Sequence, residues 1–160
     1  MRIGIGYDIH PLKRGCKFLL GGVEIPYKKG FFGHSDGDVL FHAVVDALLG
    51  AAGLGDIGEH FSDKDSRWEG VSSSVFAEKT LTILKKNKFK ILNVDAVVIA
   101  EEPKLSSHKN AIRRSVAKVL GLKEADVSVK AKTNERLGPI GRGKAVAVMA
   151  VAAIQKVGKK

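Results

Sequence analysis

The strongest constraint on the fold is one helical segment in the first third of the chain. Its apolar side chains recur at the spacing of one helical face, at Phe41, Val44, Val45, Leu48 and Leu49. Ser35 is the expected N-cap, with Asp38 three residues later as an acidic capping-box partner, and Gly53 and Gly55 end the helix. A helix with one apolar face has to pack against a second layer of structure.

The rest of the chain supplies that layer. Strand patterns occupy residues 2–10, 91–101 and 127–133, and a hairpin with Gly21 and Gly22 at its turn occupies residues 17–26. Helical patterns occupy residues 73–87 and 106–120, the second of them capped by Ser106 or Ser107. Loops are expected at residues 28–34, 54–71 and 137–143.

The last apolar segment, residues 145–157, fits a helix by its alanines and a strand by its valines, and periodicity leaves both open. The order of the other elements predicts an α+β fold in which helices cover one face of a mixed sheet. With 160 residues, the chain is expected to form a single domain, 1–160.

The amino-acid composition limits the kinds of binding partner and the cellular location that we expect for this chain. The net charge of +10 favours polyanions such as nucleic acid or phosphorylated small molecules. The lysines are not interleaved with aromatic residues, which is typical of a solvated surface, so no nucleic-acid partner is expected. The single cysteine, Cys16, excludes an internal disulfide and indicates a reducing, cytoplasmic location. No membrane partner is expected, because the sequence has neither a secretory pattern nor an apolar run of about 20 residues.

Asp8 and His10 form the first candidate site. Residues two apart on a strand point to the same side, so this pair can hold one ion. Asp38, His42 and Asp46 are spaced four apart on the predicted helix and share a polar stripe. For the two aspartates alone a solvated stripe is the simpler interpretation, whereas a histidine between them suits metal ligation. Asp8, His10 and His42 together would suit catalytic zinc with an open position, although spacing alone leaves their meeting undecided.

A second candidate site lies between Lys130 and Glu135, where three glycines follow within eight residues. Thr133 and Glu135 share a strand face if the strand runs that far, and a hydroxyl beside a carboxylate can hold a phosphate and a hard cation. The glycines let backbone amides approach phosphate, although the P-loop ending is absent. A strand followed by an ordinary turn explains the same residues. His60 and His108 are expected to be surface histidines.

Together these segments resemble the 2-C-methyl-D-erythritol 2,4-cyclodiphosphate synthase family. The resembling stretches are Gly4-Ile-Gly-Tyr-Asp-Ile-His10, Gly33-His-Ser-Asp-Gly-Asp38, His42-Ala-Val-Val-Asp-Ala-Leu-Leu-Gly-Ala-Ala52, Gly55-Asp-Ile-Gly58, Phe61-Ser-Asp63, Lys130-Ala-Lys-Thr-Asn-Glu135 and Gly141-Arg-Gly143. They follow one another along nearly the whole chain. Lys132 departs from the threonine common in relatives, and Pro139 and Lys144 replace aromatic and acidic residues outside the expected reaction centre.

The resemblance implies a homotrimer whose active sites lie between neighbouring subunits. It makes residues 145–157 a strand, which gives a two-layer sandwich with a mixed four-stranded sheet. It places Zn²⁺, or another divalent cation, on Asp8, His10 and His42. A second ion, Mg²⁺ or Mn²⁺, would bridge the substrate diphosphate with help from Glu135.

The resemblance also implies the substrate and its contacts. The substrate would be 4-diphosphocytidyl-2-C-methyl-D-erythritol 2-phosphate, whose 2-phosphate attacks its own β-phosphorus and releases CMP. The residues implied as catalytic are His34, Thr133 and Glu135. The residues implied as substrate-binding are Asp8, His10, His34, Ser35, Asp56, Gly58, Phe61, Asp63 and Arg142, with Ala100, Lys104, Leu105, Ala131, Lys132 and Thr133 from the neighbouring subunit.

Two other function classes remain open from the sequence. A related metal phosphoesterase would use the same ligands with water as the nucleophile, and it would yield no cyclic product. A basic nucleic-acid-binding module would use the scattered lysines, but it leaves Asp8, His10 and His42 unexplained.

Overall fold

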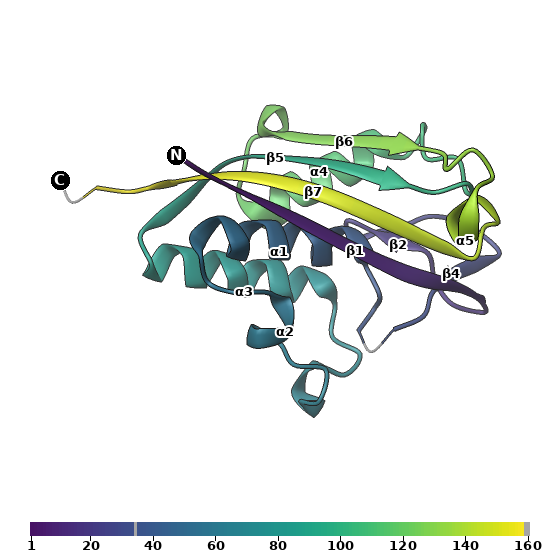
Figure 1. Cartoon of the computed structure of the whole chain (residues 1–160), viewed down its shortest axis with the longest axis horizontal. Helices are drawn as coiled ribbons and strands as arrows, with labels where there is room; N and C mark the ends of the chain where they lie inside the picture. The colour runs from purple at the N-terminus through teal and green to yellow at the C-terminus, as the bar shows by residue number, and fades with distance from the viewer. Residues whose placement is uncertain (34, 159–160) are drawn as a thin grey trace.

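The computed structural model describes residues 1–33 and 35–158 and places a mixed sheet against a layer of helices (Figure 1). Within these residues the main sheet has five strands in the order β4-β1-β7-β5-β6, and only β5 and β6 run parallel. The strands are β1 (Arg2–Arg14), β4 (Lys29–Phe31), β5 (Phe89–Ile99), β6 (Val127–Lys132) and β7 (Ala145–Lys156). The main helices are α1 (Val39–Ala52), α3 (Ser73–Lys86) and α4 (Lys109–Leu120). The predicted α+β fold is confirmed.

The sequence predicts four strands, and the structure has five in its described part. The additional strand, β4, pairs antiparallel with the end of β1, where Leu12 is opposite Phe31. A strand of three residues is too short to display alternation, so the sequence alone predicts a loop there. The predicted hairpin is present as β2 (Leu19–Leu20) and β3 (Val23–Glu24).

Strand β1 packs directly on α1 because two of its inward positions are glycine. A Cβ at Gly4 would lie 2.1 Å from a carbonyl oxygen of α1, and one at Gly6 would lie 2.0 Å from another. Side chains larger than hydrogen therefore have no room at these positions. Asp8 and His10 continue the same inward row, so the close approach carries them to the N-terminal half of α1.

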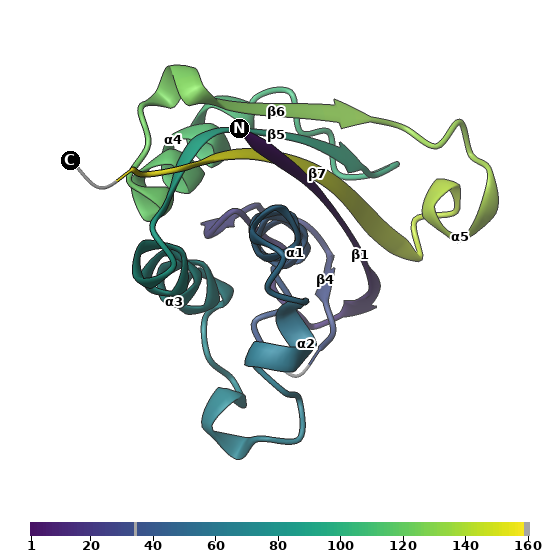
Figure 2. The same cartoon turned by 60° about the vertical axis from the view of Figure 1, so that its left-hand side comes forward.

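The opposite face of β1 and β7 carries exposed apolar side chains. Ile3 and Ile5 on β1 are 65% and 63% exposed, and Tyr7 follows them on the same side. Met149 and Val151 on β7 are also exposed. Figure 2 shows α1, α3 and α4 on the other side of the sheet. The chain therefore presents an apolar sheet surface, which is typical of a protein–protein contact.

Asp38, rather than the predicted Ser35, is the N-cap of α1. Its Oδ1 accepts hydrogen bonds from the N–H groups of Leu40 and Phe41, as an N-cap does. The same carboxylate accepts the N–H groups of Gly21 and Gly22 at the turn of the β2–β3 hairpin. Asp38 is fully buried, so it does not belong to a solvated stripe. It joins the hairpin to the start of the helix that carries His42.

The remaining elements lie close to their predicted positions. Residues 145–157 form strand β7, and α3, β5 and β6 match their predicted segments. The N-cap of α4 is His108 rather than a serine. The predicted loops contain four-residue helices or one turn of 3-10 helix: α2 (Ile57–His60), η1 (Ser66–Trp68) and α5 (Gly138–Gly141), while η2 (Glu124–Asp126) precedes β6. Among the described residues, no helix combines the length and apolar character needed to cross a membrane.

Candidate active site

Three side chains from β1 and α1 meet at one point. Asp8 Oδ2 lies 2.9 Å from His10 Nε2 and 3.0 Å from His42 Nδ1, and the two ring nitrogens are 3.2 Å apart. All three side chains are largely shielded from solvent. The fold thus brings together the residues whose meeting the spacing leaves undecided.

The three atoms form a donor set suited to a divalent metal. Nitrogen and oxygen donors held tetrahedrally at the usual zinc bond lengths lie roughly 3.3 Å apart, close to the spacing between these atoms. Three protein ligands leave a fourth position for water or substrate. Burial raises the pKa of Asp8, but its contacts with the rings of His10 and His42 outweigh burial and hold that pKa well below its usual range. Asp8 is therefore an anionic donor.

The far edge of the His42 ring contacts two hydroxyl groups. His42 Nε2 lies 2.9 Å from Ser73 Oγ and 3.2 Å from Ser35 Oγ. Ser73 Oγ in turn donates to Asp36 Oδ1 at 2.5 Å. Sequence reasoning missed Asp36 and Ser73, because they are 37 residues apart and nothing in their spacing connects them.

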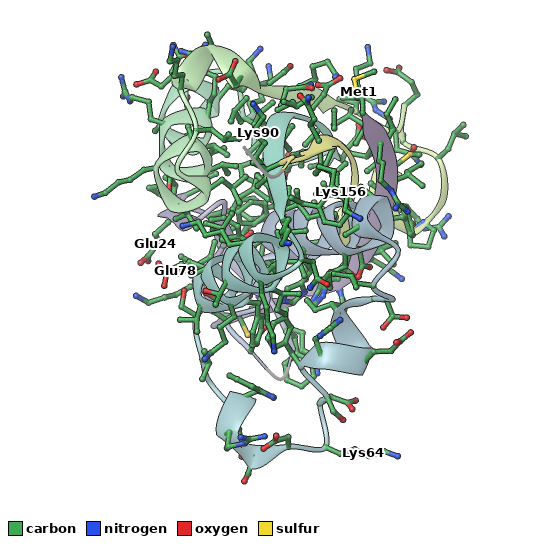
Figure 3. All side chains as sticks on the ribbon, turned by 90° about the vertical axis from the view of Figure 1, so that its left-hand side faces the viewer. Met1, Glu24, Lys64, Glu78, Lys90 and Lys156 are labelled. Atoms are coloured by element: carbon green, nitrogen blue, oxygen red, sulfur yellow. The ribbon has the colours of Figure 1, made fainter. Side chains whose placement is uncertain are left out.

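A cavity of about 670 Å³ opens beside His10 and His42, and we call it the metal-side cavity. The expected substrate-binding residues that line it are Ser35, Gly58, Phe61 and Asp63, joined by Gly33, Ile57, Lys64, Ser66, Trp68, Glu69 and Phe76. His34, also expected here, lies outside the described residues. Figure 3 shows Lys64 on the segment that projects away from the sheet beyond α2. One side of the cavity is therefore formed by the connection between α2 and α3.

An aromatic cluster forms the apolar wall of the metal-side cavity. Phe61 stacks on Phe76 with ring centroids 5.1 Å apart, and Trp68 meets both rings edge-on. Trp68 and Phe76 are absent from the sequence-based site. Residues 54–71 lack the periodicity that would place Trp68, and the helical pattern at residues 73–87 predicts Phe76 as a core residue. Such a wall suits the carbon skeleton of a ligand whose charged ends lie elsewhere.

Two aspartates hold the segment around α2. Asp46, one turn after His42, accepts the N–H of Ile57 at 2.8 Å, and burial raises its pKa. Asp56 is the N-cap of α2 and accepts the N–H of Glu59. Asp56 is exposed and stands beside Gly58 without lining the cavity itself. Asp46 thus fixes this wall of the cavity to the helix that carries His42.

The other expected substrate contacts gather at the carboxyl ends of β5 and β6. Ala100, Lys104, Leu105, Ala131, Lys132 and Thr133 line a separate cavity of about 270 Å³, which we call the strand-end cavity. A larger hollow of about 880 Å³ shares Lys104 and Thr133 with it and includes Arg142. The strand-end and metal-side cavities have no lining residue in common.

Glu135 lies beyond the end of β6 but still reaches Thr133. The strand stops at Lys132, and Glu135 has a φ of 49°, so the two residues do not share a strand face. The turn instead brings Thr133 Oγ1 to donate to Glu135 Oε1 at 2.5 Å. The expected hydroxyl–carboxylate pair is therefore present, through a turn rather than through strand alternation.

Comparison with known proteins places the chain in a family. The YgbB family model matches residues 1–155. The chain belongs to the YgbB family. The 2-C-methyl-D-erythritol 2,4-cyclodiphosphate synthase of Desulfosudis oleivorans is 54% identical over 154 residues, which cover 96% of this chain and 92% of that protein.

Solved structures of this family have the same fold. The bifunctional IspDF from Campylobacter jejuni superposes with a TM-score of 0.94 at 38% identity, and the match covers 98% of this chain and 42% of that longer protein. The CDP complex of IspF from Plasmodium falciparum superposes with a TM-score of 0.85 at 38% identity, over 98% of this chain and 97% of that one.

Proposed function

We propose that this YgbB-family protein converts 4-diphosphocytidyl-2-C-methyl-D-erythritol 2-phosphate to 2-C-methyl-D-erythritol 2,4-cyclodiphosphate and CMP, as a lyase of non-mevalonate isoprenoid precursor biosynthesis. The observation that carries the proposal is the convergence of Asp8, His10 and His42 beside a cavity with an apolar wall. The 54% identity to a synthase of this name supports it over most of the chain. The likeness to IspF in complex with CDP supports a cytidine-diphosphate ligand.

The reaction needs positioning more than a protein nucleophile. An oxygen of the 2-phosphate bonds to the β-phosphorus, the bond from that phosphorus to the bridging oxygen breaks, and CMP leaves with that oxygen. No water is consumed. Two anionic phosphates must be brought together, so charge neutralisation and orientation supply most of the rate enhancement.

The methylerythritol end of the substrate would lie in the metal-side cavity. His34 and Ser35 bind the 2-phosphate, and Asp56, Gly58, Phe61 and Asp63 hold the carbon skeleton and its hydroxyls. Phe61 contributes to the aromatic wall on which that skeleton lies.

Asp8, His10 and His42 would hold Zn²⁺ or another divalent cation. When bound, this ion supplies positive charge to the β-phosphate. The three donors fix its position from two packed elements, β1 and α1, and the fourth position stays free for a phosphate oxygen.

The strand-end cavity would hold the cytidine and its phosphates. Ala100, Lys104, Leu105, Ala131 and Lys132 surround the nucleotide, and Arg142 meets its phosphates from the adjoining hollow. Thr133 and Glu135 stand together at its edge, where the carboxylate would hold Mg²⁺ or Mn²⁺ beside the diphosphate and the hydroxyl would bind a phosphate oxygen.

One substrate would then use cavities from two subunits of a homotrimer. The separation of the two cavities within a single chain supports this arrangement. The exposed apolar face of β1 and β7 offers the surface through which subunits associate. We expect the trimer to work in the cytoplasm without a membrane or nucleic-acid partner.

Product analysis in water enriched in ¹⁸O tests the activity. A cyclic diphosphate free of solvent oxygen, together with CMP, is the expected result by ³¹P NMR and mass spectrometry. CMP together with a linear 2,4-bisphosphate that carries ¹⁸O would instead identify the protein as a phosphoesterase that uses water as the nucleophile.

A further inference from the structure

We propose that Ser73 and Asp36 are positioning residues that fix the tautomer and ring orientation of His42, so that Nδ1 faces the metal. This inference rests on the proposed metal site and concerns side chains that touch neither metal nor substrate. It adds a requirement to the proposed metal site, because Ser73 on α3 orients His42 on α1.

The hydrogen-bond chain has only one consistent direction. An ionised carboxylate only accepts, so the hydroxyl of Ser73 donates to Asp36 Oδ1. Ser73 Oγ then offers His42 Nε2 a lone pair at 2.9 Å, and that nitrogen has to carry the proton. Ser35 Oγ is farther away, at 3.2 Å, and its hydrogen has another acceptor in Ser73 Oγ, 3.3 Å away.

In a neutral imidazole, a proton on Nε2 leaves a lone pair on Nδ1. That lone pair points at Asp8 Oδ2, 3.0 Å away, and at His10 Nε2, 3.2 Å away. The lone pair of Nδ1 and the anionic oxygen of Asp8 repel each other at this distance unless a cation lies between them. The serine therefore prepares His42 for metal rather than for a hydrogen bond to Asp8.

The serine is held too firmly to be replaced by water. Ser73 is fully buried at the first position of α3. Asp36 accepts two hydrogen bonds from Ser73: Oδ1 accepts the hydroxyl, and Oδ2 accepts the backbone N–H at 3.1 Å. Asp36 Oδ1 further accepts the N–H of Asp38, the N-cap of the helix that carries His42. One carboxylate thus joins the starts of α1 and α3 across the histidine.

A purely structural role is the alternative, in which Asp36 only caps α3. Ser73→Ala separates the two roles, because it keeps the backbone N–H that Asp36 accepts and removes only the hydroxyl. Thr80→Val is the matched control: Thr80 is equally buried on the same helix, and its hydroxyl has no hydrogen-bond partner among the described residues.

The experiment titrates each metal-free protein with Zn²⁺ and with Co²⁺ against a competing chelator. Ser73→Ala should weaken metal binding by about 10–100-fold, the usual effect of losing an outer-shell partner, while Thr80→Val binds as the parent does. Ser73→Thr, which keeps the hydroxyl, should restore binding. In the Co²⁺ protein, the proton on His42 Nε2 gives a paramagnetically shifted NMR signal. This proton should exchange with solvent faster in Ser73→Ala than in the parent, because the variant lacks the hydroxyl that accepts it.

The positioning role would be overturned if Ser73→Ala had a lower melting temperature but the metal affinity and proton exchange of the parent. Asp36 and Ser73 would then act only as a cap of α3. A parent protein that binds neither metal would contradict both the proposed site and this role. A parent that binds metal but makes no cyclic diphosphate would contradict the proposed reaction alone.

Discussion

The metal-side and strand-end cavities differ in how they are held. The donors of the metal-side cavity are mostly buried, and they are fixed by β1 packing on α1 and by the contacts of Asp36, Asp46 and Ser73. The strand-end cavity combines buried Ala100 and Leu105 with exposed side chains near the carboxyl ends of two parallel strands, including Lys104 and Thr133. One chain therefore preorganises the metal half of the proposed site, and we expect association to complete the nucleotide half.

Removing a metal ligand should give the largest effect. His42→Ala is expected to lower metal affinity by more than the roughly 10–100-fold that an outer-shell loss causes, and to abolish turnover. Bound zinc, measured by atomic emission after gel filtration, checks the first expectation and CMP release checks the second. His108→Ala, a histidine substitution at the start of α4, is the control. Full zinc occupancy in His42→Ala would show that the metal half is assigned wrongly.

The next largest effect is expected at the edge of the strand-end cavity. Glu135→Gln removes a carboxylate charge that would bind the second cation, so it should lose most activity and need more Mg²⁺ or Mn²⁺ for half-maximal rate. Zinc content should stay at the parent level, because Glu135 is not part of the metal-side cavity. Glu124→Gln removes another exposed carboxylate as the control. An unaltered Mg²⁺ titration would exclude Glu135 as the ligand of the second ion.

A stability effect is expected beneath the metal-side cavity, at Asp38. Asp38→Asn places amide hydrogens against backbone N–H groups, so it should lower the free energy of unfolding by about 1–3 kcal/mol near pH 4. Burial raises the pKa of Asp38 to about 6, against the opposing effect of the Gly22 and Gly21 amides. A folded-state pKa above the unfolded value stabilises the parent at low pH, and this stability is lost as the pH rises through about 6.

The difference between the parent and Asp38→Asn should therefore shrink between pH 4 and pH 7 in urea titrations of the metal-free proteins. A difference that grows over this range would mean that the amides, rather than burial, dominate the ionisation of Asp38. No comparable buried carboxylate lies among the residues that line the strand-end cavity.

The smallest effect is expected at Lys104. This exposed side chain contributes one charge-assisted contact, so Lys104→Ala should weaken CDP binding by only about 5-fold, or roughly 1 kcal/mol. Isothermal titration with CDP at two salt concentrations measures the change, and Lys109→Ala on α4 is the control. If Lys104→Ala and Lys109→Ala lost the same amount of CDP affinity, Lys104 would act through general electrostatic attraction rather than through a contact in the strand-end cavity.

The sequence predicts the parts of this structure that follow short-range rules. Strand alternation places Asp8 and His10 on one side, and the apolar periodicity from Phe41 to Leu49 places His42 on a helix. The N-cap prediction is wrong because Asp38 is chosen by a long-range contact with Gly21 and Gly22, which local spacing does not contain. The short strand β4 is missed because three residues display no period.

Other parts of the site depend on turns and tertiary contacts that the sequence pattern does not contain. The Thr133–Glu135 pair forms through a turn with positive φ at Glu135, a conformation that alternation does not predict. Ser73 contacts His42, and Trp68 lines the metal-side cavity against Phe76 of α3, so their roles depend on the packing of α3 beside α1. The family resemblance assigns six residues to a neighbouring subunit, which stays a prediction: Ala100, Lys104, Leu105, Ala131, Lys132 and Thr133.

Subunit complementation tests most directly that the site is divided between chains. His42→Ala, expected to be inactive, and Glu135→Gln, expected to lose most activity, are mixed in equal amounts, dissociated and reassembled. Each variant subunit keeps the half of the site that the other one lacks. In a closed trimer, an interface that joins the metal-side cavity of a Glu135→Gln subunit to the strand-end cavity of a His42→Ala subunit therefore contains one intact site. Random assortment predicts recovery of about a quarter of the parent activity. A mixture that stays as inactive as its components, although mass spectrometry shows mixed assemblies, would contradict the division of the site between chains.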